Sequence, residues 1–170
     1  AFPSALLALG LAVTNLAATS PAHAHDHAAG PLKIGHPWSR ATPGGAKVAG
    51  GYVRIVNTGS APDTLTGASV PFATSGEIHS MSMEGGVMKM AAVDGGLVIK
   101  PGETVELKPG GFHLMFEGLS ASLKVGEPVS GTLGFQRTGE VRVTFAVAPI
   151  GAKAPNAPAA TEPAAGHHQH

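Results

Sequence analysis

Short runs of alternating hydrophobic and polar residues fill the middle of the chain, and clusters of Gly, Pro and Asn separate them. This pattern is typical of β-strands joined by tight turns. The clearest predicted strands are 51–56, 77–81, 87–90, 97–99, 105–107, 112–117, 131–135 and 141–147. No helical period lasts longer than a turn or two. The pattern therefore predicts an all-β domain, either an antiparallel sandwich or a barrel.

Both ends of the chain differ from this middle part. Residues 1–24 contain an apolar run, 5–13, that is too short to span a bilayer, followed by an Ala22-His23-Ala24 cleavage signal. We interpret 1–24 as a secretory signal peptide; a retained membrane anchor is the alternative. The expected remainder is a His-containing arm at 25–30, the β domain at 31–150 and an Ala/Pro/His-rich tail at 151–170, with both the arm and the tail flexible. We expect an exported, periplasmic protein without stable membrane insertion after signal removal.

Composition removes several classes of function. The 170 residues suit one domain, and 43% are hydrophobic, which allows a packed core. The net charge is zero, which argues against nucleic-acid binding. The chain has no Cys, so disulfides, thiolate zinc sites, iron–sulfur clusters, Cys nucleophiles and blue-copper centres are excluded. No hydrolase or nucleotide-binding motif is present, and we expect no enzyme activity.

Methionine is concentrated in one part of the chain. All five Met residues lie between positions 81 and 115, and His79 and His113 are each followed two residues later by Met. Because side chains of a strand alternate between faces, His113 and Met115 should share one face, opposite a core face of Phe112, Leu114 and Phe116. By the same rule Met88 and Met90 share a face, as do His79 and Met81.

Such a mixture of imidazole and thioether groups indicates a soft metal ion. Thioether sulfur selects Cu(I), and imidazole also binds copper, whereas zinc, calcium and magnesium prefer other ligands. The alternative is that the Met residues only fill the core. Core packing does not explain the repeated His-x-Met, or Met residues next to Ser80 and Lys89. His36 has no Met neighbour, and we interpret it as structural.

The spacing of these residues resembles a known family. The order of the candidate ligands is similar to the motif of the periplasmic copper chaperone family PCuAC (DUF461). In this chain it reads His79, ten residues, Met90, twenty-two residues, His113, one residue, Met115. The second interval is one residue longer than in that family, and the Gly-rich turns at 94–96 or 109–111 can accommodate the difference. Further similar segments are 38–42, 51–52 with 57–59, 86–90 and 108–118, so the resemblance covers roughly 33–149.

The resemblance implies a fold, a site and a role. It implies a cupredoxin-like Greek-key β-sandwich, with Cu(I) bound by His79, Met90, His113 and Met115. Met81 is an auxiliary candidate that replaces one ligand or helps the ion enter, while Met83 and Met88 are expected to be peripheral. The implied role is delivery of copper to the apo copper centre of cytochrome c oxidase or to its assembly factors.

The tails suggest a second, Cu(II) site. Cleavage after Ala24 leaves His25-Asp26-His27 at the amino terminus, where the amine, two amides and His27 form a square-planar nitrogen set that suits Cu(II). Cleavage after Ala22 places His25 third instead. His167, His168 and His170 form a further candidate Cu(II) or zinc site. The alternatives are a polar arm and a residual tag.

Three other functions stay open from the sequence. The first is a periplasmic Cu(II) storage or resistance protein, in which the tails are the primary metal sites. A copper oxidase or monooxygenase would use His25 as its amino-terminal ligand. A structural sandwich would contain the Met cluster as packing alone.

Overall fold

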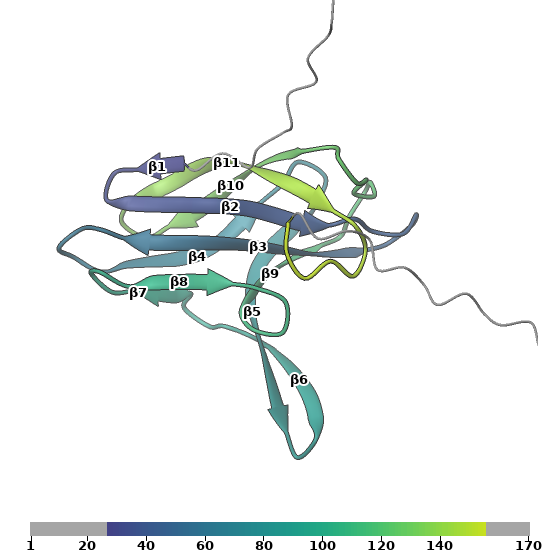
Figure 1. Ribbon diagram of the computed structural model, residues 1–170, viewed down its shortest axis with the longest axis horizontal. Coiled ribbons are helices and arrows are strands. Elements are labelled where there is room, and N and C mark those ends of the chain that lie inside the picture. Colours follow the sequence, from purple (N-terminus) through teal and green to yellow (C-terminus); the bar gives the residue numbers. More distant parts are fainter. Residues whose placement is uncertain (1–26, 156–170) are drawn as a thin grey trace, which may run out of the picture.

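The computed structural model describes residues 27–155, and this part of the chain consists of strands and contains no helix (Figure 1). The strands are β1 (His27–Ala29), β2 (Leu32–Arg40), β3 (Val48–Asn57), β4 (Asp63–Ser69), β5 (Ser75–Glu84), β6 (Val87–Ala92), β7 (Leu97–Ile99), β8 (Thr104–Leu107), β9 (His113–Glu117), β10 (Val129–Phe135) and β11 (Gly139–Ala148). The predicted all-β, cupredoxin-like sandwich is confirmed.

The strands form two layers that are joined through β11. One layer has the order β6-β5-β9-β3-β2, with β1 beside β2 and β8 beside β3, and the other has the order β10-β4-β7. The first part of β11 pairs antiparallel with β10, and its last residues, Ala146 to Ala148, run parallel to β2. The two layers thus close over one core, which sets the position of every strand that carries a candidate ligand.

Large apolar side chains from both layers meet in this core. Phe116 of β9 and Phe145 of β11 pack edge to face, with ring centroids 5.7 Å apart. A side chain at Gly51 would place its Cβ 2.7 Å from the Phe116 ring, so the glycine of β3 makes room for that ring. Strand β9 is therefore held tightly from both sides.

A smaller apolar cluster lies outside this core, against β2 and β3. Trp38 and Tyr52 stack with centroids 4.4 Å apart, and buried Ala148 and Ala152 pack beside them. The Arg40 guanidinium lies over the Tyr52 ring, 5.7 Å from its centroid, and its Nε donates to the Ala152 carbonyl at 2.7 Å.

Parts of both segments that we expected to be flexible are ordered. His27–Ala29 form β1 because the free edge of β2 offers backbone partners, and His27 pairs with Ile34. Ala152 is buried because it is small and apolar and fills the space beside Trp38. The predicted signal peptide and His25, His167, His168 and His170 lie outside the described residues. Between residues 27 and 155 we find no helix capable of crossing a membrane.

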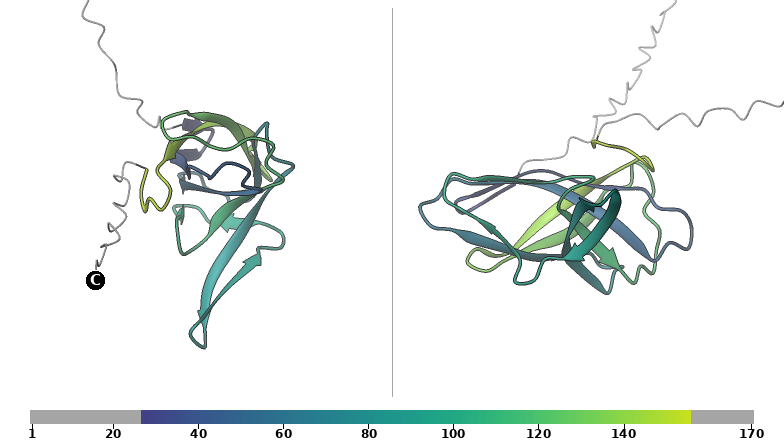
Figure 2. Two further views of the ribbon diagram at one scale, coloured as in Figure 1. Left: turned by 90° about the vertical axis from the view of Figure 1, so that its right-hand side faces the viewer. Right: turned by 90° about the horizontal axis from the view of Figure 1, so that it is seen from below.

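Strands β5 and β6 form a hairpin that projects from the sandwich (Figures 1 and 2). The first half of β5 pairs with β9, whereas Ser80 to Glu84 pair only with β6. Gly85 and Gly86 form the turn, with φ of 58° and 78°. Two consecutive positive φ values are typical of the type I′ turn of a two-residue hairpin loop, and glycine adopts them without strain.

Candidate metal centre

Strand pairing places the candidate ligands on three adjacent strands. β5 lies between β9 and β6, so that His79 is opposite His113 on one side and opposite Ala92 on the other. Two residues further along β5, Met81 is opposite Met90. Residues that are directly opposite in antiparallel strands lie on the same face of the sheet. His79, Met81, Met90 and His113 therefore share one face.

The core lies on the other face of these strands. Ile78 of β5 is 3% exposed and Leu114 of β9 is 0% exposed, and both belong to the core cluster. His113 and Met115 alternate with core residues, as predicted. Phe112 was expected in the core, but β9 begins one residue later and Phe112 is 38% exposed, because it belongs to the preceding loop rather than to the strand.

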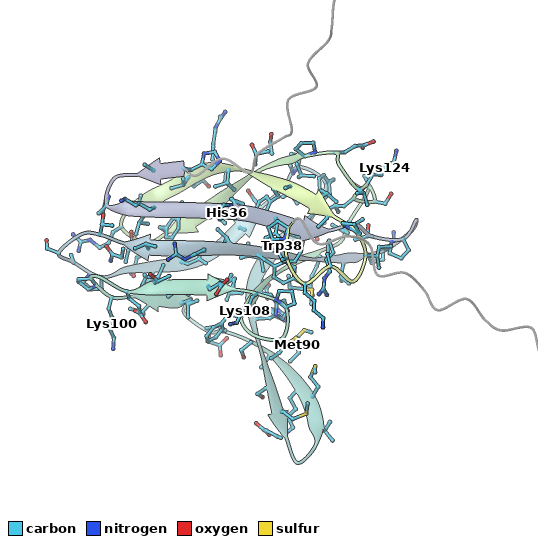
Figure 3. The ribbon with its side chains drawn as sticks, viewed as in Figure 1. His36, Trp38, Met90, Lys100, Lys108 and Lys124 are labelled. Atoms are coloured by element: carbon cyan, nitrogen blue, oxygen red, sulfur yellow. The ribbon has the colours of Figure 1, made fainter. Side chains whose placement is uncertain are left out.

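A surface hollow of about 420 Å³ lies beside this face. Its sulfur and imidazole lining comes from β5, β6 and β9: Met81, Met88, Met90, His113 and Met115. Arg40 of β2 and Val48 and Tyr52 of β3 also line it. In Figure 3, Met90 lies where the hairpin leaves the sandwich. Met90, which is far from His113 and Met115 in the sequence, thus lies at the same hollow as they do.

His113 is the most firmly positioned of these side chains. It is 5% exposed, and its Nδ1 lies 3.1 Å from the carbonyl oxygen of Gly111. Because a carbonyl can only accept, Nδ1 carries the proton in this hydrogen bond, which leaves the Nε2 lone pair free for a metal ion. The same carbonyl accepts from the backbone N–H of Met81, which ties β5 to the loop before β9.

His79 is nearly buried and lacks hydrogen-bond partners. Both of its ring nitrogens are covered and make no hydrogen bond, although the Glu77 carboxylate lies 3.6 Å from Nε2. Its ring centroid is 5.9 Å from that of His113. Burying a polar nitrogen without a partner is costly, and a bound ion would supply that partner. His79 does not line the hollow itself, but it is the cross-strand neighbour of His113, which does.

Three of the four methionines of the hairpin are exposed rather than packed, and Met81 is partly buried. Met90 is 48%, Met88 57% and Met83 64% exposed. A methionine that fills a core is buried, so core packing does not account for these three. Their exposure favours a role that requires contact with something outside the protein.

Arg40 and Tyr52 also line the hollow. The Arg40 guanidinium is held by its contact with the Tyr52 ring and by its hydrogen bond to the Ala152 carbonyl. Burial raises the pKa of Tyr52, and the charge of Arg40 only partly offsets this effect, so that the phenol stays neutral at physiological pH. Among residues 27–155, no three His or carboxylate side chains cluster in a way that could hold an ion. The soft donors that line the hollow beside His113 are the sulfurs of Met81, Met88, Met90 and Met115.

The remaining histidines lie elsewhere. His27 is in β1, which is separated from β9 by β2 and β3. His36 is exposed at a bulge of β2, where its φ is 49°. The structure thus gathers His79, Met81, Met90, His113 and Met115 and leaves His27 apart from them.

Comparison with known proteins places this arrangement in a family. Residues 32–147 match the LpqE-like family of lipoproteins. The chain is 34% identical over 130 residues to the protein named "Putative lipoprotein Lxx21020" of Leifsonia xyli subsp. xyli, covering 75% of this chain and 77% of that protein. The chain belongs to the LpqE-like family.

Solved structures relate this LpqE-like chain to copper-binding domains. The copper-bound PCuAC domain from PmoF2 is 31% identical, with a TM-score of 0.64, and the match covers 74% of this chain and 98% of that domain. The Cu(I) form of DR1885 from Deinococcus radiodurans is 32% identical, with a TM-score of 0.51, over 66% of this chain and 74% of that protein. The resemblance to PCuAC domains is confirmed.

Two features of the LpqE-like site were not predicted from the sequence. The Gly111 carbonyl orients His113, and Glu77 lies beside His79. Strand alternation alone could have found Glu77, because it lies two residues before His79 and so shares its face. Nothing in the sequence singles out the Gly111 carbonyl, since every residue has one.

Proposed function

We propose that this protein is a periplasmic copper chaperone that binds Cu(I) through His79, Met90, His113 and Met115. The observation that carries the proposal is the single hollow at which Met90 of β6 lies beside His113 and Met115 of β9. Soft, uncharged thioethers with imidazoles form a set that suits Cu(I). The copper-bound PCuAC domain supports copper as the ion, and the Cu(I) form of DR1885 supports this oxidation state.

The contrast between buried and exposed ligands supports transfer rather than storage. His113 is held in the protein by its hydrogen bond to Gly111, while Met90 is nearly half exposed. An incoming ligand from an acceptor can reach the exposed side of the ion while His113 still holds it. Copper then passes by ligand exchange: a bond to the acceptor forms as a bond to a thioether breaks, without a change of oxidation state. Met81, which also lines the hollow, is an auxiliary ligand for this exchange.

The proposed acceptors are the apo copper centre of cytochrome c oxidase and its assembly factors. This part of the proposal comes from the resemblance to the PCuAC family. The LpqE-like relationship and the lipoprotein name of the Leifsonia relative support an exported protein. The histidines of the two tails remain candidates for a separate Cu(II) site.

An anaerobic Cu(I) titration against a competing chelator tests the binding site. We expect the double variant His113→Ala/Met115→Ala to lose the high-affinity Cu(I) equivalent, because it removes two of the four proposed ligands. His36→Ala is the matched control, since it removes an exposed imidazole away from the hollow and should leave the affinity unchanged. Unaltered Cu(I) affinity in the double variant, with its fold intact by circular dichroism, would falsify the proposed site.

A further inference from the structure

The β5–β6 hairpin carries two methionine pairs that the proposed ligand set does not use fully. Met83 of β5 is opposite Met88 of β6, and Met81 is opposite Met90. The positions alternate, so both pairs lie on the face that also carries His79. Met83 and Met88 form the outer pair, next to the turn, and Met81 and Met90 form the inner pair, next to the sandwich. Met88 also lines the hollow together with the inner pair, so the two pairs adjoin there.

The turn determines how closely each pair approaches. In a hairpin with a two-residue loop, the residues that flank the loop, here Glu84 and Val87, form a hydrogen-bonded pair. Pairs then alternate, which makes Met83–Met88 and Met81–Met90 non-hydrogen-bonded pairs. In such pairs the Cβ atoms are about 4.5–5.5 Å apart and the side chains lie closest. Each pair can therefore bring two sulfurs to one ion.

The distance between the two pairs also suits transfer. They are two residues apart along each strand, which corresponds to about 6.4–6.8 Å. Methionine side chains are long and flexible enough to lean toward one another over that distance. The four sulfurs form a path from the turn to the hollow.

The opposite face of the same hairpin is polar. Ser82 is opposite Lys89, and Lys89 forms an ion pair with Glu84. At the end of the hairpin neither face rests on the core, because Ser82 to Glu84 and all of β6 are exposed. Met83 and Met88 therefore have no packing role, since each exposes more than half of its surface. What distinguishes the two faces of the hairpin is the sulfur.

We propose that Met83 and Met88 form a second Cu(I) site at the end of the hairpin, from which the ion passes through Met81 and Met90 to His113. Two thioethers select Cu(I) and leave coordination positions open for a partner's ligand. Between the methionines one Cu–S bond forms as another breaks, and in the last step a bond to Nε2 of His113 forms as a Cu–S bond breaks. No electron moves, and no proton is released, because thioethers do not ionise and Nε2 carries no proton. The passage to His113 rests on the proposed function, whereas binding at the outer pair does not.

Anaerobic Cu(I) titration of the native chain and two variants tests the outer site. Met83→Leu/Met88→Leu keeps the size of both side chains but removes both sulfurs. Ser82→Ala/Lys89→Ala is the matched control, a cross-strand pair on the other face of the hairpin. We expect the native chain to bind two equivalents, the leucine variant to lose only the weaker one, and the control to keep both. Retention of both equivalents by the leucine variant overturns the proposal.

The same titration separates this site from the first one. His113→Ala/Met115→Ala should lose the stronger equivalent and keep the weaker one. If that variant keeps both, the proposed function fails while the outer site stands. NMR of methyl-labelled methionine gives a direct readout: the Met83 and Met88 methyl signals should shift when Cu(I) is added to the His113→Ala/Met115→Ala variant. Unshifted signals overturn the outer site.

Transfer is tested by kinetics. The stronger equivalent of the leucine variant should pass to a Cu(I) chelator more slowly than that of the Ser82→Ala/Lys89→Ala control, although its affinity is the same. Equal transfer rates overturn the path through the hairpin.

Discussion

The sandwich and the hairpin hold their side chains in opposite ways. In the sandwich, β9 is enclosed by β3 and β5, and Phe116 and Leu114 anchor it in the core. In the hairpin, β6 has a neighbour on one side only and every residue is exposed. The proposed copper site lies where the two regions meet, with His113 from the first and Met90 from the second.

This difference explains how one site can bind an ion and also release it. The sandwich positions an imidazole before any ion arrives, which lowers the ordering cost of binding. The hairpin supplies soft ligands that solvent and a partner can reach. If the comparison holds, substitutions in the sandwich change stability most, and substitutions in the hairpin change copper binding with little effect on global stability.

Phe116→Ala should have the largest effect. The ring is 2% exposed and contacts Phe145 across the core, so its removal should lower the free energy of unfolding by about 3–5 kcal/mol. Urea denaturation measures the change. Met83→Ala on the exposed hairpin is the control, with an expected change within about 0.5 kcal/mol. Similar losses in both variants would contradict the contrast between the two regions.

Asp63→Asn should have an intermediate effect that depends on pH. Burial raises the pKa of the Asp63 carboxyl, but hydrogen bonds from the Thr138 hydroxyl and from the backbone N–H groups of Arg137, Thr64 and Thr138 outweigh it, so that the pKa lies below its usual value. An amide presents an NH₂ group to some of these donors. We expect a loss of about 1–3 kcal/mol at pH 7, measured by urea denaturation.

The sign of the pH dependence follows from the lowered pKa. A carboxyl whose pKa is lower in the folded state stabilises the fold fully above its unfolded pKa of about 3.9. The contribution is lost as the pH falls through the folded-state pKa. The difference between the native chain and Asp63→Asn should therefore shrink below about pH 4. A difference in the free energy of unfolding that stays constant at all pH values would rule out the ionised carboxylate as its source. Cu(I) affinity at pH 7 should be the same in both proteins, since Asp63 does not line the hollow.

The sequence predicted strands best where large apolar residues alternate regularly. Strand β7 has the predicted bounds, 97–99. Strands β3, β5 and β9 begin and end within a few residues of their own predicted bounds. Strands β2 and β4 were not among the clearest predictions. The alternation in β2 is interrupted by a bulge at Gly35 and His36, and β4 contains Leu65 as its single large apolar residue. Strand β1 is only three residues long.

For the candidate site, alternation predicted the shared faces but not the pairing of strands. That His113 and Met115 face away from the core follows from a period of two residues. That β9 lies beside β5 does not, because this pairing joins segments distant in the sequence and depends on how the whole core closes. The exposure of the methionines has the same origin: the β5–β6 hairpin extends beyond the edge of the sandwich (Figure 1), and no local sequence pattern predicts this.

Gly85→Val should have the smallest effect on global stability but a clear one on the hairpin. Gly85 has a φ of 58°, and a Cβ there would meet no atom within 4 Å, so only the backbone conformation opposes a side chain. The left-handed conformation costs an L-residue about 1–2 kcal/mol, with a higher cost for β-branched residues and a lower one for Asn. Gly85→Asn is thus a matched control at the same position. In Gly85→Val, we expect faster hydrogen exchange of the β5–β6 amides near the turn and weaker Cu(I) binding. The thermal midpoint should not change, because the exposed end of the hairpin, Ser82–Glu84 and β6, contributes no residue to the core. If the thermal midpoint falls together with the hydrogen-exchange protection of the β5–β6 amides, the hairpin and the sandwich unfold together. That result would contradict the proposed contrast between a rigidly held imidazole and exposed sulfurs.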